Sequence, residues 1–196
     1  MELLKPSDYF TSAGTMSLIY GGSGCGKTIL SGSFAQQYKT LFLNTEGIGP
    51  QSLNQYPEWF ENLDIININT EGDLDTCLEK LLLGQHSYKA VSLDTLSNFQ
   101  FVMADEIIQT EVKSDVSDAK SGKRVYRPHD PDMLEQQDWG RILHRIWLKI
   151  SRLQYLSQQG IHVVVTCQLG EKLDPKDRDK KEMIYFPQLR GAWQTM

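Results

Sequence analysis

The chain has 196 residues, 40% of them hydrophobic, which is enough for one α/β domain with a buried core. Its formal net charge of −5 excludes a protein that binds nucleic acid through overall positive charge, so any such contact must come from local patches. Three scattered cysteines exclude a disulfide or zinc framework, and no apolar run is long enough to cross a membrane. We therefore expect a single domain over residues 1–196, located in the cytoplasm and without membrane contact.

Apolar and amphipathic segments alternate along the chain, which is the pattern of a mostly parallel sheet with helices on both faces. The expected strands cover residues 16–20, 40–44, 64–69, 89–94, 161–167 and, with a weaker pattern, 183–186. Helices are expected over residues 28–39, 73–83 and 135–159. The sequence therefore predicts an α/β protein.

The spacing of apolar residues predicts which side chains face the core. The first strand is expected to be buried, and the helix after it to turn Ile29, Leu30 and Phe34 inward. The last helix has one apolar stripe, and the basic residues on its other faces are expected to be solvated. The stripe comprises Trp139, Ile142, Leu143, Ile146, Trp147, Ile150 and Leu153, and the basic residues are Arg141, Arg145, Lys149 and Arg152.

Two polar stretches interrupt the alternation of strands and helices. Residues 113–134 contain two prolines, and residues 169–182 are mostly charged. Loops of this length in a compact domain are usually functional or disordered. We expect both stretches to be long surface loops.

A glycine-rich loop follows the first expected strand and fits the pattern G-x-x-x-x-G-K-[ST] at every fixed position. Its glycines allow backbone N–H groups to turn inward around phosphate oxygens, and the next helix points its positive end toward them. We expect Lys27 to reach the β- and γ-phosphates and the Thr28 hydroxyl to bind Mg²⁺. The nucleotide-binding residues are Gly21, Gly22, Ser23, Gly24, Cys25, Gly26, Lys27 and Thr28.

Three further strand ends carry side chains suited to nucleotide chemistry. Asp94 ends an apolar strand, where a carboxylate holds Mg²⁺ or, alternatively, caps the following helix. Glu46 lies two residues past a strand. Its alternative roles are a general base that takes a proton from water and an ordinary solvated loop residue. Gln168 ends another strand, where its amide senses the γ-phosphate or only satisfies backbone groups.

Four segments in order, "GGSGCGKT", "FLNTEG", "AVSLD" and "TCQ", resemble the core of RecA-type P-loop ATPases. The resemblance covers roughly residues 15–170 and implies a three-layer P-loop NTPase fold with strand order 3-2-4-5-1, which would place Glu46 beside Asp94. It implies that Lys27, Glu46 and Gln168 act in catalysis, with Glu46 as the base and Gln168 beginning a DNA-binding loop. It also implies that Asp94 serves Mg²⁺.

Two segments narrow the resemblance within that family. "QQDWGRI" before the long helix and "FPQLRG" near the end look like short phage-encoded RecA-like ATPases of recombination and single-strand annealing. This likeness implies a protein of the host cytoplasm and a homo-oligomer, ring or filament, in which a neighbouring subunit's Arg or Lys acts on the phosphate.

The family places DNA contacts in the loops after the fourth and fifth core strands. Residues 113–127 carry five basic and two acidic side chains, whereas residues 171–182 carry five of each. An aromatic residue among cations suits single-stranded DNA, because the charges follow the phosphates and the ring stacks on a base. The expected DNA contacts are Lys120, Lys123, Arg124, Tyr126 and Arg127.

The leading hypothesis is a Mg²⁺-dependent ATPase that binds ATP and hydrolyses it while acting on single-stranded DNA in recombination, annealing or repair. A P-loop kinase for a small molecule is one alternative. The other is a nucleotide-gated DNA-binding module with negligible turnover. No N-K-x-D motif occurs, which disfavours a GTPase.

Overall fold

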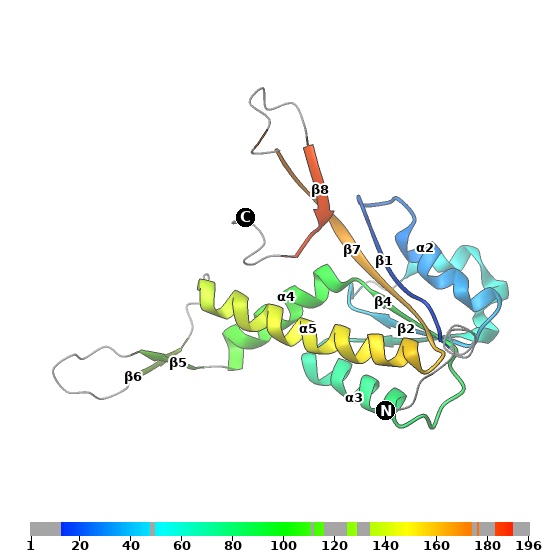
Figure 1. Cartoon of the computed structure of the whole chain (residues 1–196), viewed down its shortest axis with the longest axis horizontal. Helices are drawn as coiled ribbons and strands as arrows, with labels where there is room; N and C mark the ends of the chain where they lie inside the picture. The colour runs from blue at the N-terminus through cyan, green and yellow to red at the C-terminus, as the bar shows by residue number, and fades with distance from the viewer. Residues whose placement is uncertain are drawn as a thin grey trace, which may run out of the picture.

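The computed structural model describes residues 13–47, 50–110, 112–115, 125–128, 134–173, 176 and 183–189. In this part of the chain the main sheet has six strands, with β1, β7, β4, β2 and β3 side by side in that order and parallel (Figure 1). The last strand, β8, pairs antiparallel with β7. Numbered along the chain, the parallel strands follow the order 3-2-4-5-1, so the expected topology is confirmed.

The observed elements lie close to the expected ones. The strands of the main sheet are β1 (Met16–Gly21), β2 (Thr40–Asn44), β3 (Leu63–Asn67), β4 (Ala90–Asp94), β7 (His162–Leu173) and β8 (Met183–Pro187). The α-helices are α2 (Lys27–Gly32), α3 (Glu71–Leu82), α4 (Leu96–Thr110) and α5 (Gln136–Gln158). Short 3₁₀ helices are η1 (Ser33–Gln36), η2 (Gln51–Gln55) and η3 (Pro57–Asn62). In the described parts of the chain, no helix is long and apolar enough to cross a membrane.

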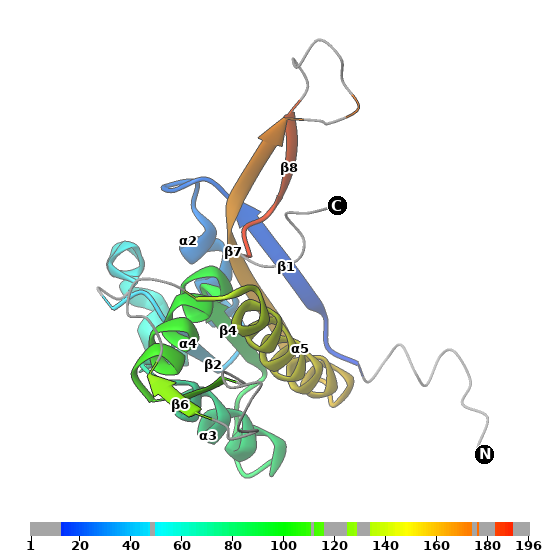
Figure 2. The same ribbon diagram turned by 90° about the vertical axis from the view of Figure 1, so that its left-hand side faces the viewer.

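Helices cover both faces of the sheet (Figures 1 and 2). On one face, α3, α4 and α5 pack against β2, β4 and β7 in the larger core. On the other face lie α2 and the 3₁₀ helices, with a smaller core around Phe42. Because successive side chains of a strand point to opposite faces, Leu41 and Leu43 enter the larger core and Phe42 the smaller one. These layers confirm the expected fold class of a three-layer P-loop NTPase.

The first strand, β1, is exposed at the edge of the sheet, which corrects the expectation of a buried strand. Leu18 and Tyr20 are 51% and 44% exposed. Among the described strands only β7 pairs with β1, and α5 packs over β7. An apolar run alone does not distinguish an edge strand from a central one.

The helix after the glycine loop is shorter than the expected 28–39. It ends at Gly32 and continues as the 3₁₀ helix η1. The hydroxyls of Ser31 and Ser33 donate to carbonyl oxygens three residues earlier, and such bonds disfavour regular helix. Ile29 packs against the smaller core as expected, whereas Leu30 is 53% exposed, so its inward placement was wrong.

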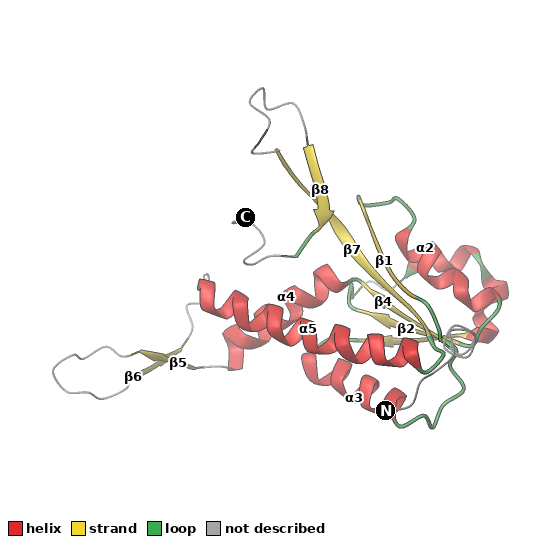
Figure 3. Cartoon of the chain, viewed as in Figure 1, coloured by secondary structure: helices red, strands yellow, loops and turns green. Residues whose placement is uncertain are grey.

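Both stretches expected as loops contain strands. Within 113–134, an antiparallel ribbon joins β5 (Val112–Asp115) and β6 (Val125–Pro128) and projects beyond α4 and α5 (Figure 3). Within 169–182, β7 continues to Leu173 and pairs with β8. These stretches contain few apolar residues, so the apolar alternation that marks a half-buried strand is weak in them.

Three basic residues of α5 pair with acidic residues of α3. The Lys149 ammonium lies 2.8 Å from a Glu71 oxygen and 2.7 Å from an Asp75 oxygen, and Lys149 is buried rather than solvated. Arg145 pairs with Glu71, and Arg152 with Asp75. This side of α5 therefore holds two helices together. In contrast, Trp147 is 62% exposed and does not belong to the buried stripe.

Candidate active site

The glycine loop connects β1 to α2 at the carboxyl edge of the sheet. Gly24 and Gly26 have φ values of 73° and 90°, which side chains with a Cβ rarely adopt. A Cβ atom at either position, or at Gly22, would have no neighbour within 4 Å, so the loop faces open space. Gly26 immediately precedes α2 and directs the helix N-terminus at the loop. This is the concave backbone cradle that phosphate groups require.

Lys27 reaches back over the loop from the first position of α2. Its ammonium donates hydrogen bonds of 2.9 Å to the carbonyl oxygens of Gly21 and Gly22. The Cys25 sulfur lies 4.0 Å from the same nitrogen, and this cysteine is exposed. The cation is therefore held at the mouth of the loop, where phosphate charge would be received.

Thr28, in the first turn of α2, contacts Asp94 at the end of β4. The Thr28 hydroxyl donates a 2.7 Å hydrogen bond to Asp94, and the Thr166 hydroxyl donates to the other carboxylate oxygen. Asp94 is 2% exposed. Asp94 is not the cap of the following helix, because the hydroxyl of Thr95 accepts a hydrogen bond from the backbone N–H of Asn98 and so caps α4. A hydroxyl and a carboxylate are oxygen donors of the kind Mg²⁺ prefers, so the residues present fit that ion.

Glu46 lies beside Asp94, as the expected strand order implies. Asn44 and Asp94 are partners in the β2–β4 register, and Glu46 follows Asn44 by two residues. Its backbone N–H donates to the Asn44 side chain over 3.1 Å, and its carboxylate accepts a weak 3.4 Å bond from the Thr95 hydroxyl. The carboxylate is otherwise exposed to solvent, which leaves an oxygen available to accept a proton.

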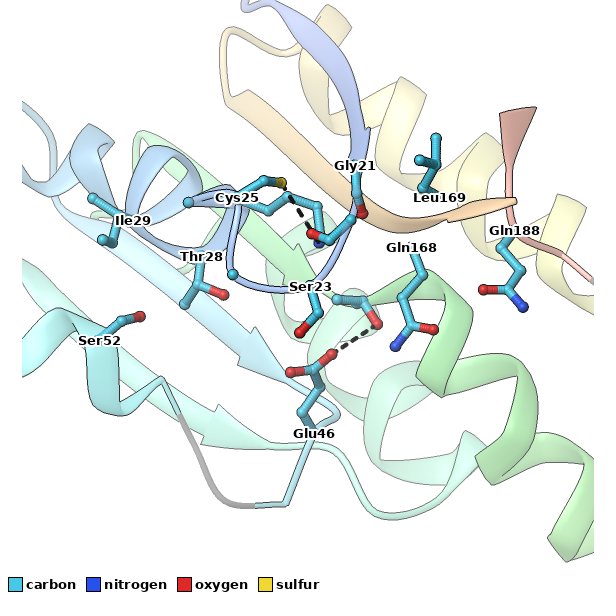
Figure 4. A pocket seen from close by; sticks show the side chains of 15 residues that line it. Gly21, Ser23, Cys25, Thr28, Ile29, Glu46, Ser52, Gln168, Leu169 and Gln188 are labelled. Carbon is cyan, nitrogen blue, oxygen red and sulfur yellow. Dashed lines mark hydrogen bonds between the residues drawn. The ribbon is translucent and has the colours of Figure 1, made fainter. Parts of the chain in front are cut away.

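Gln168 completes the group of predicted residues. It ends the stretch of β7 paired with β1 and lies opposite Gly21. A cavity of about 330 Å³ is lined by the glycine loop together with Glu46, Thr95 and Gln168. Figure 4 shows the side chains of Ser23, Glu46 and Gln168 pointing into the same part of this cavity. The structure therefore brings the phosphate-binding, metal-binding and catalytic candidates into one site.

Four residues of this site were not predicted from the sequence. Thr95 contacts Glu46, and Thr166 holds Asp94. Ser97 binds the backbone of Gln168, and Gln188 lines the cavity. Thr166 could have been predicted from the sequence, because it lies two residues before Gln168 and so on the same face of a strand. The others depend on how α4 and the segment after β8 approach the site.

Two of the three cysteines, Cys77 and Cys167, are partly or fully buried. Burial raises the pKa of the Cys167 thiol to about 11, and the nearby Ser97 hydroxyl only partly offsets this. Burial also raises the pKa of Cys77. Cys25, at the cavity, is the exposed thiol among the three, so it is the natural site for a chemical probe.

The structure does not test the predicted DNA contacts. Lys120, Lys123 and Arg124 lie outside the described residues. Tyr126 and Arg127 belong to β6, so their backbone lies in the projecting ribbon. These assignments remain predictions.

A protein-family model described as an AAA domain matches residues 13–195 of the chain. The matched region contains the glycine loop, Glu46, Asp94 and Gln168, and thus every part of the cavity described above. No curated protein matches the sequence.

Proposed function

Because the chain belongs to the AAA domain family, it is a P-loop ATPase-type domain, and we propose that it is an ATPase that uses Mg²⁺–ATP and acts on single-stranded DNA. One observation carries the ATPase proposal. A phosphate cradle, an oxygen donor pair, a solvent-accessible carboxylate and a strand-end amide line or border one cavity at the carboxyl edge of the sheet. Ligands bind in this position in open α/β sheets.

Each residue has a distinct role in the proposed reaction. The loop N–H groups and Lys27 bind the phosphates and stabilise the charge that develops on them. Thr28 and Asp94 would hold Mg²⁺, which neutralises phosphate charge when bound. Glu46 accepts the proton of the attacking water, and Thr95 orients the carboxylate through its hydroxyl. Gln168 donates its amide N–H to the terminal phosphate.

The DNA part of the proposal is supported by the β5–β6 ribbon and its composition. An isolated two-stranded ribbon is marginally stable alone, so a projecting one is suited to ordering on a partner. The stretch from residue 113 to 127 is rich in lysine and arginine and includes Tyr126. Cations with an interleaved aromatic ring suit a single strand. The segments "QQDWGRI" and "FPQLRG", which look like those of short phage-encoded RecA-like ATPases, support a role in recombination or annealing. The same likeness supports assembly into a ring or filament in the host cytoplasm.

Phosphate release measured with and without single-stranded DNA tests this proposal. We expect Mg²⁺-dependent release of phosphate from ATP that DNA accelerates, and loss of that release in Lys27→Ala. A wild-type rate no higher than that of Lys27→Ala would exclude the ATPase. Hydrolysis that DNA leaves unchanged, in a protein that fails to retain DNA on a filter, would exclude the DNA substrate.

A further inference from the structure

Ser97 joins two segments of the chain that border the cavity, one at Gln168 and one at Gln188. Its hydroxyl donates a 2.7 Å hydrogen bond to the carbonyl oxygen of Gln188 and accepts one of 2.9 Å from the backbone N–H of Gln168. The backbone N–H of Gln188 in turn donates to the carbonyl oxygen of Gln168 over 2.8 Å. These three hydrogen bonds close a ring, and Ser97 is only 2% exposed.

This ring lies where β7 changes its pairing partner. Gln168 is the last residue of β7 paired with β1, and from Leu169 onward β7 pairs with β8. Gln188 follows β8 directly, and Leu189 packs against the larger core. The ring therefore fastens the base of the β7–β8 ribbon to the edge of the cavity.

We propose that Gln188 is a second amide for the terminal phosphate of the nucleotide and that Ser97 is its positioning residue. This inference rests on the proposed function. Gln188 lines the same cavity as Gln168 and Glu46 (Figure 4). A glutamine side chain carries two N–H donors, which suit phosphate oxygens. Ser97 lies outside the cavity lining and acts through the backbones of the two glutamines.

The chemical consequence is discrimination between ATP and ADP. The backbone of Gln188 is hydrogen-bonded to that of Gln168, and Figure 4 shows Gln188 farther from Ser23 of the glycine loop than Gln168 is. We therefore expect its side chain to contact the terminal phosphate rather than the phosphates nearer to the nucleoside. The hydrogen bonds of Ser97 fix the backbone from which the Gln188 side chain extends. Changes at either residue should therefore weaken binding of ATP and leave ADP binding unaltered.

Calorimetric affinities for ADP and a non-hydrolysable ATP analogue, both with Mg²⁺, test the proposal. Gln188→Glu keeps the shape of the side chain but places a negatively charged carboxylate near the phosphate. Because the two negative charges repel, this variant should lower the affinity for the analogue about 10-fold or more. Ser97→Ala should lower it about fivefold, the equivalent of one net hydrogen bond. The ADP affinity of both variants should stay within about twofold of the wild-type value, a difference no larger than that expected for changes at sites that do not interact. Gln154→Glu, an exposed change on α5, controls for net charge.

A merely structural role for Ser97 would change both affinities together. Ser97→Thr retains the hydroxyl and should restore the analogue affinity. The losses in the double variant Ser97→Ala/Gln188→Ala should be smaller than the sum of the two single losses, because Ser97 acts in part through Gln188. Unchanged ratios of analogue to ADP affinity in both Gln188→Glu and Ser97→Ala would overturn the proposal.

The proposed function and this inference fail in different ways. If wild type and Lys27→Ala bind the analogue equally weakly, the nucleotide assignment itself is wrong. A different result would show that only the role of Gln188 and Ser97 is wrong. In that case wild type binds the analogue, Lys27→Ala does not, and Gln188→Glu has the same ratio of analogue to ADP affinity as wild type. Should Ser97→Ala unfold, Gln188→Glu decides the question by itself.

Discussion

The Thr28 hydroxyl donates a 2.7 Å hydrogen bond to the Asp94 carboxylate and so ties the first turn of α2 to the end of β4. Thr166 donates to the same carboxylate from β7. Both oxygens of this buried carboxylate therefore accept hydrogen bonds from hydroxyl groups, and one of those hydroxyls belongs to the predicted Mg²⁺ ligand Thr28. The pair is therefore our proposed Mg²⁺-binding part of the site.

Asp94→Asn should impair the use of Mg²⁺ more than nucleotide binding. Asparagine keeps the size of the side chain, and the two hydroxyls can reorient toward it, but the negative charge is lost. We expect the Mg²⁺ concentration that supports half-maximal hydrolysis to rise about 10- to 100-fold, which is the loss of metal affinity seen when a residue that supports a metal site is replaced. Phosphate release titrated with Mg²⁺ measures this change, and ADP affinity in EDTA is the control. A normal Mg²⁺ titration would remove Asp94 from the metal site.

Nucleotide should protect Cys25 from alkylation. Cys25 is the exposed thiol and lines the cavity, whereas burial raises the pKa values of Cys77 and Cys167 and keeps both thiols protonated at neutral pH. Mass spectrometry after brief iodoacetamide treatment should show one fast-reacting cysteine, which slows several-fold with ADP and is missing in Cys25→Ser. Equal labelling rates with and without saturating ADP would contradict the position of the loop in the site.

The order and type of elements were predictable because each depends on local sequence. Strand–loop–helix patterning located the glycine loop, and the polar residues at strand ends located Glu46, Asp94 and Gln168. The exposure of β1 was not predictable, because it depends on which strands pair with it. Ser97 and Gln188 lie 91 positions apart in the chain and meet only through the path of β8, which no local pattern specifies. The β5–β6 ribbon and the extension of β7 beyond residue 167 were missed because their sequences are polar, whereas β8 was predicted over residues 183–186.

The pairing of α5 with α3 predicts a stability effect at Lys149. Lys149→Ala should lower the free energy of unfolding by about 2–3 kcal/mol, somewhat below the usual cost of breaking a buried ion pair, since Arg145 and Arg152 still partly compensate Glu71 and Asp75. Urea unfolding followed by circular dichroism measures the loss. Lys80→Ala, an exposed change on α3, should stay within about 0.5 kcal/mol of wild type. Equal midpoints for the two variants would show that the ion pairs contribute little.

The basic stretch that includes β6 should carry the salt dependence of DNA binding. Replacing Lys123, Arg124 and Arg127 by alanine should weaken binding to single-stranded DNA and reduce the slope of log affinity against log salt by about 0.7 for each lost phosphate contact. ATP affinity should be unchanged. Fluorescence anisotropy of a labelled oligonucleotide at several salt concentrations measures the slope. An unaltered slope would place DNA elsewhere, although Arg145, Lys149 and Arg152 are already paired with acidic residues.

Glu46→Gln should separate nucleotide binding from hydrolysis. Glutamine has the same shape and can still bond a water molecule and the Thr95 hydroxyl, but it cannot accept a proton at neutral pH. General-base assistance contributes about 10²- to 10⁴-fold to rate, so single-turnover hydrolysis should fall by that factor. ATP affinity should stay near the wild-type value, because the loop, Lys27, Thr28 and Asp94 are unchanged.

The same variant connects hydrolysis to DNA binding. If the ATP-bound form is the one that holds DNA, slower hydrolysis prolongs that form, and single-stranded DNA should dissociate more slowly from Glu46→Gln when ATP is present. Dissociation rates measured with ADP should be equal for the two proteins, since Glu46 acts only on the triphosphate. Glu58→Gln, an exposed change in η3, is the matched control and should hydrolyse ATP at the wild-type rate. Wild-type hydrolysis by Glu46→Gln would make Glu46 an ordinary loop residue, and the water would then require another base at the cavity.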